Sequence, residues 1–150
     1  MKTNLIGVML AITALILPTF SSLAGPQNSS ELAGTSWKLI RLQAADETTL
    51  VPGDGWKYTI TFGNDGRVSA RVDCNRGSST WRSTRANQLQ FGSWSMTRAK
   101  CSAGSLHDRI VREGAAVRSY YIKDGHLFLG GMAGGGSYEL EPLTAPRRRP

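Results

Sequence analysis

Hydrophobic and polar residues alternate along two neighbouring stretches of the chain, residues 57–62 (KYTITF) and 67–73 (RVSARVD). Successive side chains of a β-strand point to opposite faces, so each stretch predicts a strand with one buried and one solvated face. The Gly-Asn-Asp-Gly sequence at 63–66 is typical of a tight turn, so the three pieces predict a β-hairpin. The predicted inward residues are Tyr58, Ile60, Phe62, Val68, Ala70 and Val72, and the predicted outward ones in the second strand are Arg67, Ser69, Arg71 and Asp73.

The first strand of the domain is predicted at residues 35–42 (TSWKLIRL). The alternation there places Trp37 and Leu39 on one face and Ile40 and Leu42 on the other.

Further strands are predicted in the second half of the chain. A two-residue Asp-Gly turn divides residues 119–129 (SYYIKDGHLFL) into a hairpin. Weaker alternation predicts a hairpin of residues 79–85 and 88–91 around Ala86 and Asn87. A last strand is expected at 137–140, after a flexible glycine-rich loop at 130–136.

One segment, residues 105–117 (SLHDRIVREGAAV), has a helical period instead. Leu106, Ile110, Gly114 and Val117 share one face of such a helix, and Ser105 is placed to cap its first turn. Because a glycine inside a helix costs roughly 1 kcal/mol, the helix is expected to be short and to depend on packing.

These elements predict a mainly β (α+β) fold: a curved antiparallel sheet or partial barrel of about seven or eight short strands with one helix near 105–117. A single domain is expected at residues 32–141, between a polar leader at 25–31 and a polar, basic and disordered tail at 142–150.

The first 24 residues have the pattern of a secretory signal. Lys2 precedes an uncharged run from Leu5 to Leu17, and small residues lead to a cleavage position after Ala24. The run is shorter than the roughly 20 apolar residues of a membrane helix. No cysteine lies near the cleavage position, so no lipid anchor is expected there. The sequence therefore predicts a periplasmic or secreted protein without a stable membrane span.

The formal net charge is +7, and residues 67–118 carry most of the excess arginine. Such clustering favours a polyanionic partner such as lipopolysaccharide or nucleic acid, while a solvated basic face is the simpler interpretation. The residues proposed for a binding surface are Arg67, Arg71, Arg76, Arg82 and Arg85.

The chain has two cysteines, Cys74 and Cys101, which lie 27 residues apart. In an exported domain two cysteines usually pair, so a structural disulfide is predicted. The alternatives are a reactive thiolate near Arg76, or a metal site that would also need His107 or His126. Asn75 and Gly77 after the first cysteine fit a turn with unusual backbone angles.

The sequence contains no catalytic motif: it has no nucleophile elbow, paired carboxylates or phosphate-binding loop. No catalytic residue, metal or cofactor is therefore predicted. The tryptophans could form a stacking platform beside the arginines, or they could simply pack in the core. The candidate residues are Trp37, Trp56, Trp81 and Trp94.

Four segments together resemble the META domain, the HslJ-like family of bacterial envelope proteins. They are LAGTSWKLIRL at 32–42, ITFGNDGRVSARVDCNR at 60–76, LQFGSWSMTRAKC at 89–101 and DGHLFL at 124–129. The residues that carry the resemblance are Gly34, Thr35, Trp37, Asn75, Thr97 and Arg98.

The resemblance implies a compact antiparallel β fold with one helix and no known catalytic activity. It also implies an association with heat or envelope stress and antibiotic tolerance. This chain departs from the family pattern at Asp73, where Gly is usual, at Ser79 and Trp81, where Gly and Tyr are usual, and in lacking a lipid-anchoring cysteine.

The function expected from the sequence is that of an exported, non-enzymatic interaction scaffold. Its expected partner is an anionic envelope component or another protein, and the protein is expected to be a monomer. Two alternatives stay open: a polyanion binder that uses the five arginines, and a secreted inhibitor of another enzyme.

Overall fold

The computed structural model describes residues 31–131 and 135–143. The predicted signal at 1–24 and nearly all of the leader lie outside this range, as do residues 132–134 of the glycine-rich loop and 144–150 of the tail. The elements are β1 (Ser36–Gln43), β2 (Thr49–Leu50), the 3-10 helix η1 (Gly55–Lys57), β3 (Tyr58–Phe62), β4 (Arg67–Val72), β5 (Asn75–Arg82), β6 (Gln90–Phe91), β7 (Ser95–Met96), α1 (His107–Gly114), β8 (Val117–Lys123), β9 (His126–Gly131) and β10 (Ser137–Pro142).

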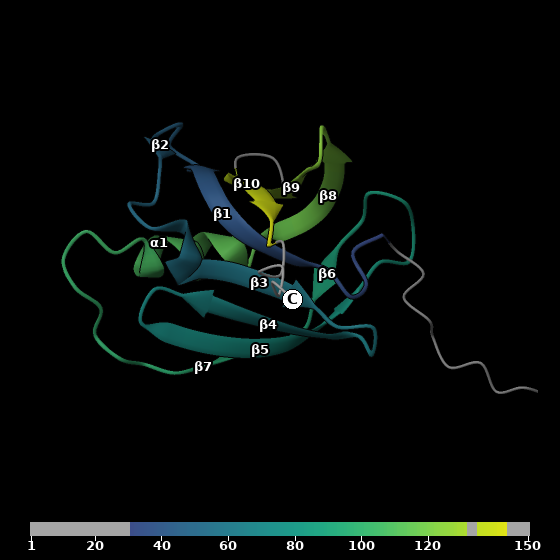
Figure 1. Cartoon of the computed structure of the whole chain (residues 1–150), viewed down its shortest axis with the longest axis horizontal. Helices are drawn as coiled ribbons and strands as arrows, with labels where there is room; N and C mark the ends of the chain where they lie inside the picture. The colour runs from purple at the N-terminus through teal and green to yellow at the C-terminus, as the bar shows by residue number, and fades with distance from the viewer. Residues whose placement is uncertain (1–30, 132–134, 144–150) are drawn as a thin grey trace, which may run out of the picture.

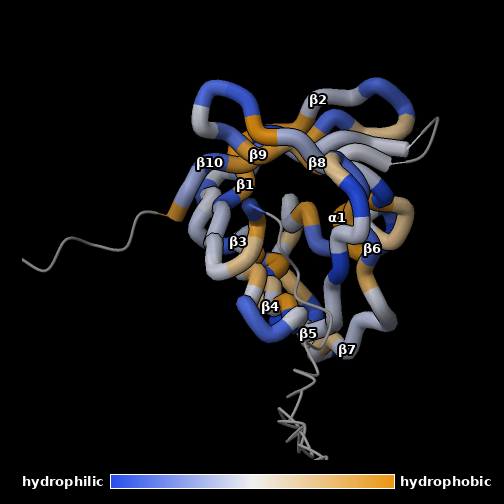
Figure 2. The backbone as a smooth tube through the Cα atoms, turned by 90° about the vertical axis from the view of Figure 1, so that its right-hand side faces the viewer, coloured by the Kyte–Doolittle hydropathy of each residue, from blue (hydrophilic) through white to orange (hydrophobic). Residues whose placement is uncertain are grey.

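The strands form one antiparallel sheet in the order β6-β5-β4-β3-β1-β10-β9-β8, with β2 beside β1 and β7 beside β5 (Figure 1). The two ends of this order meet, because the Leu89 N–H donates to the Arg118 carbonyl and the Tyr120 N–H to the Asn87 carbonyl, both at 3.0 Å. The sheet is therefore a nearly closed barrel. Figure 2 looks into it, with α1 and β6 on one side. The predicted fold class is confirmed, and α1 is the single α-helix of the described residues.

Two predicted hairpins are present as expected. In β3–β4, Phe62 lies opposite Val68 across the glycine turn. In β8–β9, Lys123 lies opposite His126, and the two turn residues, Asp124 and Gly125, both have positive φ angles. This is the backbone that a two-residue hairpin turn requires.

The prediction for β1 was wrong about its second face. The register slips between Leu39 and Arg41, so Ile40 is an extra residue opposite β10. An extra residue of this kind shifts the alternation by one position, so the residues after the bulge point to the opposite face from the one predicted. Leu42 is consequently fully buried on the same side as Trp37 and Leu39.

The chain also turns earlier at Cys74 than predicted. Val72 lies opposite Asn75, so the turn consists of Asp73 and Cys74, and Asp73 has a φ of 57°. Asn75 and Gly77 lie in β5, not in the turn, and β5 begins four residues before the predicted 79. Asp73, predicted to face outward, is buried: its N–H donates to the Lys57 carbonyl at 2.7 Å, and its carboxylate lies 3.8 Å from the Lys57 ammonium.

The helix is shorter than its predicted segment. Ser105 Oγ accepts the His107 N–H at 3.1 Å, and Leu106 occupies the cap position. The helix ends at Gly114, and Val117 is already the first residue of β8. Leu106 and Ile110 still pack against the core, as the periodicity predicted.

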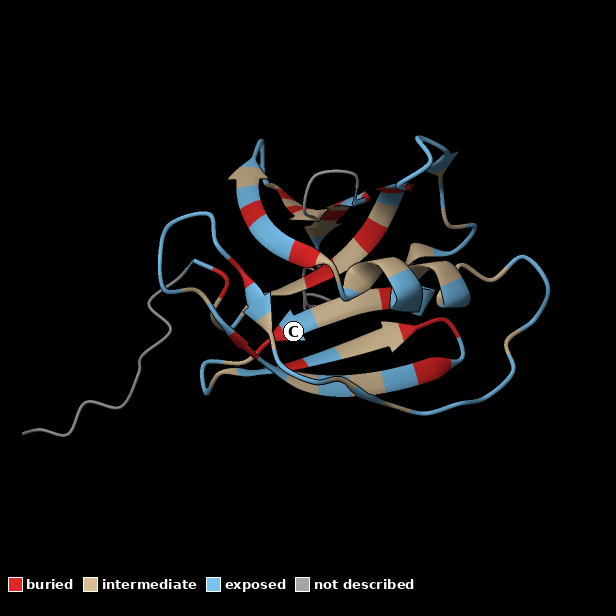
Figure 3. Cartoon of the chain, turned by 180° about the vertical axis from the view of Figure 1, so that it is seen from behind, coloured by how far each residue is buried: buried red, intermediate tan, exposed pale blue. Residues whose placement is uncertain are grey.

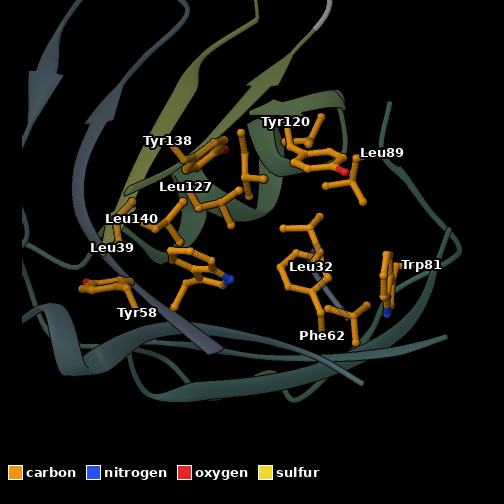
Figure 4. Packing of buried hydrophobic residues seen from close by; sticks show 14 of the residues in the cluster. Leu32, Leu39, Tyr58, Phe62, Trp81, Leu89, Tyr120, Leu127, Tyr138 and Leu140 are labelled. Carbon is orange, nitrogen blue, oxygen red and sulfur yellow. The ribbon is translucent and has the colours of Figure 1, made fainter. Parts of the chain in front are cut away.

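The buried residues lie on the inward faces of the strands, which is visible as alternating bands in Figure 3. Phe62 and Trp81 pack edge to face with 5.2 Å between ring centroids, and Leu32 lies beside them, fully buried (Figure 4). At the other end of the chain, Pro142 pairs with Trp37 and the Leu143 N–H donates to the Ser36 carbonyl. None of the described helical segments has the length and apolar character that crossing a bilayer requires.

Candidate functional site

The two cysteines form a disulfide. Cys74 lies in the β4–β5 turn and Cys101 in the segment that leads to α1, with their Cα atoms 5.5 Å apart. The bond therefore fastens the long connection between β7 and α1 to the turn before β5. Neither a free thiolate nor a thiol metal ligand is available at these positions.

Asn75 reinforces the same attachment by hydrogen bonds. Its side chain is fully buried, and its Nδ2 donates to the Ala99 carbonyl at 2.9 Å. Its Oδ1 accepts the Ala99 N–H at 2.7 Å and the Thr97 hydroxyl at 2.8 Å. Thr97 in turn exchanges hydrogen bonds with the backbone of Arg76. The Cys-Asn pair thus holds residues 97–101 on β5.

The other residues of the family resemblance form the start of β1. Gly34 has a φ of 74°, which favours glycine, and its N–H donates to the Phe62 carbonyl. The Thr35 hydroxyl donates to the Leu32 carbonyl at 2.6 Å and accepts the Trp37 indole N–H at 2.7 Å. These contacts fix the entry of the chain into the barrel and are structural.

The proposed basic surface lies mainly on the outer face of the β4–β5 ribbon. Arg71 and Arg76 are directly opposite across the two strands, while Arg67 and Arg82 lie toward the other end of the ribbon. Arg85 is exposed in the turn that follows β5. Four of the five predicted arginines are therefore brought onto one ribbon.

Three of these arginines have side-chain interactions that the structure shows: one faces an exposed carboxylate, and two donate to neutral oxygen atoms. Arg67 Nε lies 3.7 Å from an Asp65 carboxylate oxygen, and both side chains are largely exposed. Arg71 Nε donates to the Asp73 carbonyl, and Arg82 Nε to the Gln90 side-chain oxygen. Arg98, from the family resemblance, is exposed and lies outside the ribbon.

The four tryptophans do not form a stacking platform. Trp37 and Trp81 are buried, and the Trp81 indole N–H donates to the Gly63 carbonyl at 3.2 Å. Trp94 is half-buried against Phe91. Trp56 is 54% exposed, and the Lys38 ammonium lies 4.6 Å from its ring centroid.

The two histidines each contact a carboxylate. His107 Nδ1 lies 2.9 Å from Asp108, and His126 Nδ1 lies 2.9 Å from Glu139. The hydrogen bond with His126 and the adjacent Arg41 guanidinium lower the pKa of Glu139. Within residues 31–131 and 135–143, no group of three or more His, Cys, Asp or Glu is arranged to hold a metal ion.

A cavity of about 360 Å³ lies between α1 and the inner face of the sheet. Its floor is made by strand residues that include Ile60 and Ala70, and its roof by the α1 residues Ile110 and Gly114. Residues 91–96 form one wall, and Val111, 43% exposed, stands at the rim. Ligand-binding pockets have volumes of about 300–1,000 Å³, so this one is large enough for a small molecule.

One polar side chain in the cavity lining is unsatisfied. Tyr138, on β10, is 6% exposed, and its hydroxyl has no hydrogen-bond partner in the described part of the chain. The hydroxyl points from its strand into the barrel (Figure 4). Burial, with a smaller contribution from the Glu113 carboxylate, raises the pKa of Tyr138, so the group is a neutral phenol.

A family model, the META domain, matches residues 30–141. This chain belongs to the META-domain family. The family resemblance that was predicted from the Gly-Thr-x-Trp and Cys-Asn segments is thereby confirmed.

Two solved structures are similar in fold to this META-domain chain. An NMR structure of a protein from Burkholderia xenovorans aligns with a TM-score of 0.63 at 18% identity, over 89% of this chain and 97% of that one. A crystal structure of a DUF4847 family protein from Bacteroides vulgatus ATCC 8482 aligns with a TM-score of 0.54 at 11% identity, over 74% and 94%. No curated protein matches the chain.

The cavity of the META domain was not predicted from the sequence. Its signal is the presence of small residues at inward positions, Ala70 in β4 and Gly114 in α1, where larger side chains would fill the barrel. The helical period placed Gly114 on the same face as Leu106 and Ile110, but the glycine was expected only to weaken the helix.

Proposed function

We propose that this META-domain protein is an exported, non-enzymatic binding scaffold of the cell envelope. The observation that supports export is the Cys74–Cys101 disulfide. Such bonds form and persist in oxidising compartments and are rare in the cytosol. The signal-like pattern of the first 24 residues leads to the same compartment.

The scaffold part of the proposal rests on how the brace is built. A disulfide and a buried amide hold the longest irregular connection of the barrel to β5. A surface that is fixed before binding loses little conformational freedom when a partner binds. The family resemblance favours a role in heat or antibiotic stress, which a deletion strain grown under each challenge would test.

Export is tested by fractionating cells that express the full chain, followed by alkylation of free thiols. We expect a processed protein in the periplasm or medium, with both cysteines resistant to alkylation until a reductant is added. A variant lacking residues 2–24 is the matched control and should stay in the cytoplasm with two reactive thiols. Free thiols in the exported wild-type protein would refute the proposal.

A second candidate function, polyanion binding, is supported by the pair formed by Arg71 and Arg76. Like charges directly opposite each other in a sheet are destabilising, and these two arginines face each other across β4 and β5. An anionic partner would offset their repulsion. The affinity of such a partner for the ribbon would fall steeply as the salt concentration rises.

The test is elution from heparin resin over a salt gradient. Arg76→Gln should elute at clearly lower salt than the wild type. Lys123→Gln, an exposed strand residue away from the ribbon, removes the same charge and should elute later than Arg76→Gln. Equal elution of the two variants would show that only net charge matters and would remove this candidate.

A further inference from the structure

We propose that the cavity between α1 and the sheet binds a small, uncharged molecule that has an apolar body and one hydroxyl or carbonyl group. This inference goes beyond the scaffold role and is tested on purified protein, so it holds or fails independently of export. It rests on the lining of the cavity, on Tyr138, and on the charges near that residue.

The lining is mainly apolar. Strands β1, β3, β4, β9 and β10 contribute side chains that include Leu39, Ile60, Ala70 and Leu140, and α1 closes the cavity from above with Ile110. The lining also contains two charged residues, Arg71 and Arg118, whose guanidinium groups donate to backbone carbonyls: Arg71 to Asp73, and Arg118 to Ala115 and Val117. Water gains few hydrogen bonds in such a space, so an apolar body would displace it readily.

The one buried polar group of the lining without a partner is the Tyr138 hydroxyl. A Cβ atom placed on Gly114 would lie 3.7 Å from this oxygen, so the hydroxyl lies against the helix roof at its glycine. Buried polar groups normally have a hydrogen-bond partner, and a ligand hydroxyl or carbonyl would supply it. A phenol both donates and accepts, so either group fits.

The Glu113 carboxylate, which is the charge that acts on Tyr138, favours an uncharged ligand group at this hydroxyl. The Glu113 carboxylate is close enough to act on Tyr138, and its Oε2 is buried without a partner in the described residues. Its Oε1 lies 3.4 Å from the Arg109 guanidinium. A ligand carboxylate at Tyr138 would be desolvated beside a like charge, which is unfavourable.

Access to the cavity runs between α1 and residues 91–96. Val111 on the helix is exposed at this rim, and Trp94 on the opposite wall is half-buried. An apolar ligand would therefore first contact apolar side chains. Binding there should also change the fluorescence of Trp94.

The proposal is tested by calorimetric titration of the purified mature chain with three matched probes: 1-naphthol, naphthalene and 1-naphthoate. The naphthol should bind about three- to tenfold more tightly than naphthalene, the range of one neutral hydrogen bond. The naphthoate should bind most weakly. Absence of naphthol binding up to its solubility, or preference for the naphthoate, would overturn the proposal.

Two variants locate the binding. Tyr138→Phe should bind naphthalene as the wild type does but lose the preference for naphthol. Ala70→Phe places a ring inside the cavity and should weaken both probes at least tenfold. Ser69→Phe, its neighbour on the exposed outer face, is the matched control and should bind like the wild type.

Folding of each variant is checked by its thermal melt. Tyr138→Phe removes a hydroxyl that has no partner, so its melting temperature should equal or exceed that of the wild type. If Ala70→Phe fails to fold, the probe preferences of the wild type and Tyr138→Phe decide the matter. Binding that is unaffected in a folded Ala70→Phe protein would show that the probes bind elsewhere.

Discussion

Removing the disulfide and the Asn75 amide, separately and together, tests how residues 97–101 are held on β5. The disulfide variant is Cys74→Ala with Cys101→Ala. The bond closes a loop of 27 residues. In the chain-entropy model, a loop of that length stabilises the folded state by roughly 3.5 kcal/mol.

Asn75→Ala removes three well-formed hydrogen bonds, two to the Ala99 backbone and one from Thr97. Each neutral hydrogen bond contributes about 0.5–1.5 kcal/mol, so we expect a loss of about 1.5–4.5 kcal/mol. Asn75→Asp is the informative companion, because it keeps the acceptor for Thr97 and loses the donor to the Ala99 carbonyl. It should also place a buried carboxylate at the site.

The two changes should not be additive. Once the disulfide is absent, residues 97–101 can detach locally, and the Asn75 bonds are then partly broken before any mutation is made. Contacting groups typically couple by about 0.5–3 kcal/mol, so the triple variant should lose less than the sum by that amount.

The assay is urea unfolding followed by tryptophan fluorescence and circular dichroism. With a slope of about 1–3 kcal/mol/M, loss of the disulfide should lower the midpoint by roughly 1–3.5 M. Reduction of the wild-type protein should reproduce that shift. A disulfide variant that loses less than about 1 kcal/mol, or strict additivity with Asn75→Ala, would refute the view that both groups hold one segment.

Three further changes test other parts of the barrel. Gly34→Ala should lower the free energy of unfolding, measured in urea, by about 1–2 kcal/mol, because residue 34 has a positive φ angle. Gly53→Ala is the control: a Cβ atom there meets open space, so the stability should be nearly unchanged. Hydrogen bonds from the Thr48 side chain and backbone, and then from Arg109, lower the pKa of Asp46 from 3.8 to about 2. The stabilisation is therefore present above about pH 4 and lost as the pH falls toward 2, and Asp46→Asn should flatten that part of the acid-unfolding profile. Ala70→Val should raise the melting temperature, since it adds two methyl groups to an apolar cavity at about 0.8 kcal/mol each.

The alternation of hydrophobic and polar residues predicted the buried and exposed faces correctly in strands that pair with their neighbour along the chain. In β3 and β4, each inward position is apolar and the partner strand is the next one along the chain, so the local pattern determined both faces. The error at Leu42 has a different origin, because the bulge at Ile40 exists only relative to β10, about a hundred residues later. A single-sequence pattern carries no information about such a partner.

The turn at Cys74 was mispredicted for a local reason. Asn75 and Gly77 are typical turn residues, but Asp73 takes the left-handed backbone instead, which aspartate tolerates more readily than most residues. Asn75 is thereby free to enter β5 and be buried. Its polarity reflects hydrogen bonds to Thr97 and Ala99, which lie more than twenty residues away and could not be seen from the sequence.

The candidate cavity depends on the same long-range packing. Its size comes from small residues on separate elements, with Ala70 on the sheet facing Gly114 on the helix. Each of them is unremarkable alone, because alanine suits a buried strand position and one glycine only weakens a helix. Only the closure of the sheet over α1 brings the two together.

The segment between β6 and α1 links the family motif to the cavity. Residues 91–96 form a wall of the cavity, and residues 97–101, which follow directly, are attached to β5 by Asn75 and by the disulfide. The Cys-Asn and Thr-Arg-x-x-Cys segments therefore fix the position of a wall that has little secondary structure of its own. A change at Cys101 or Asn75 should consequently reach Trp94 and the cavity through the chain, without either residue touching a ligand. This arrangement explains how a motif rich in polar residues and cysteines can serve a site whose own lining is mainly apolar.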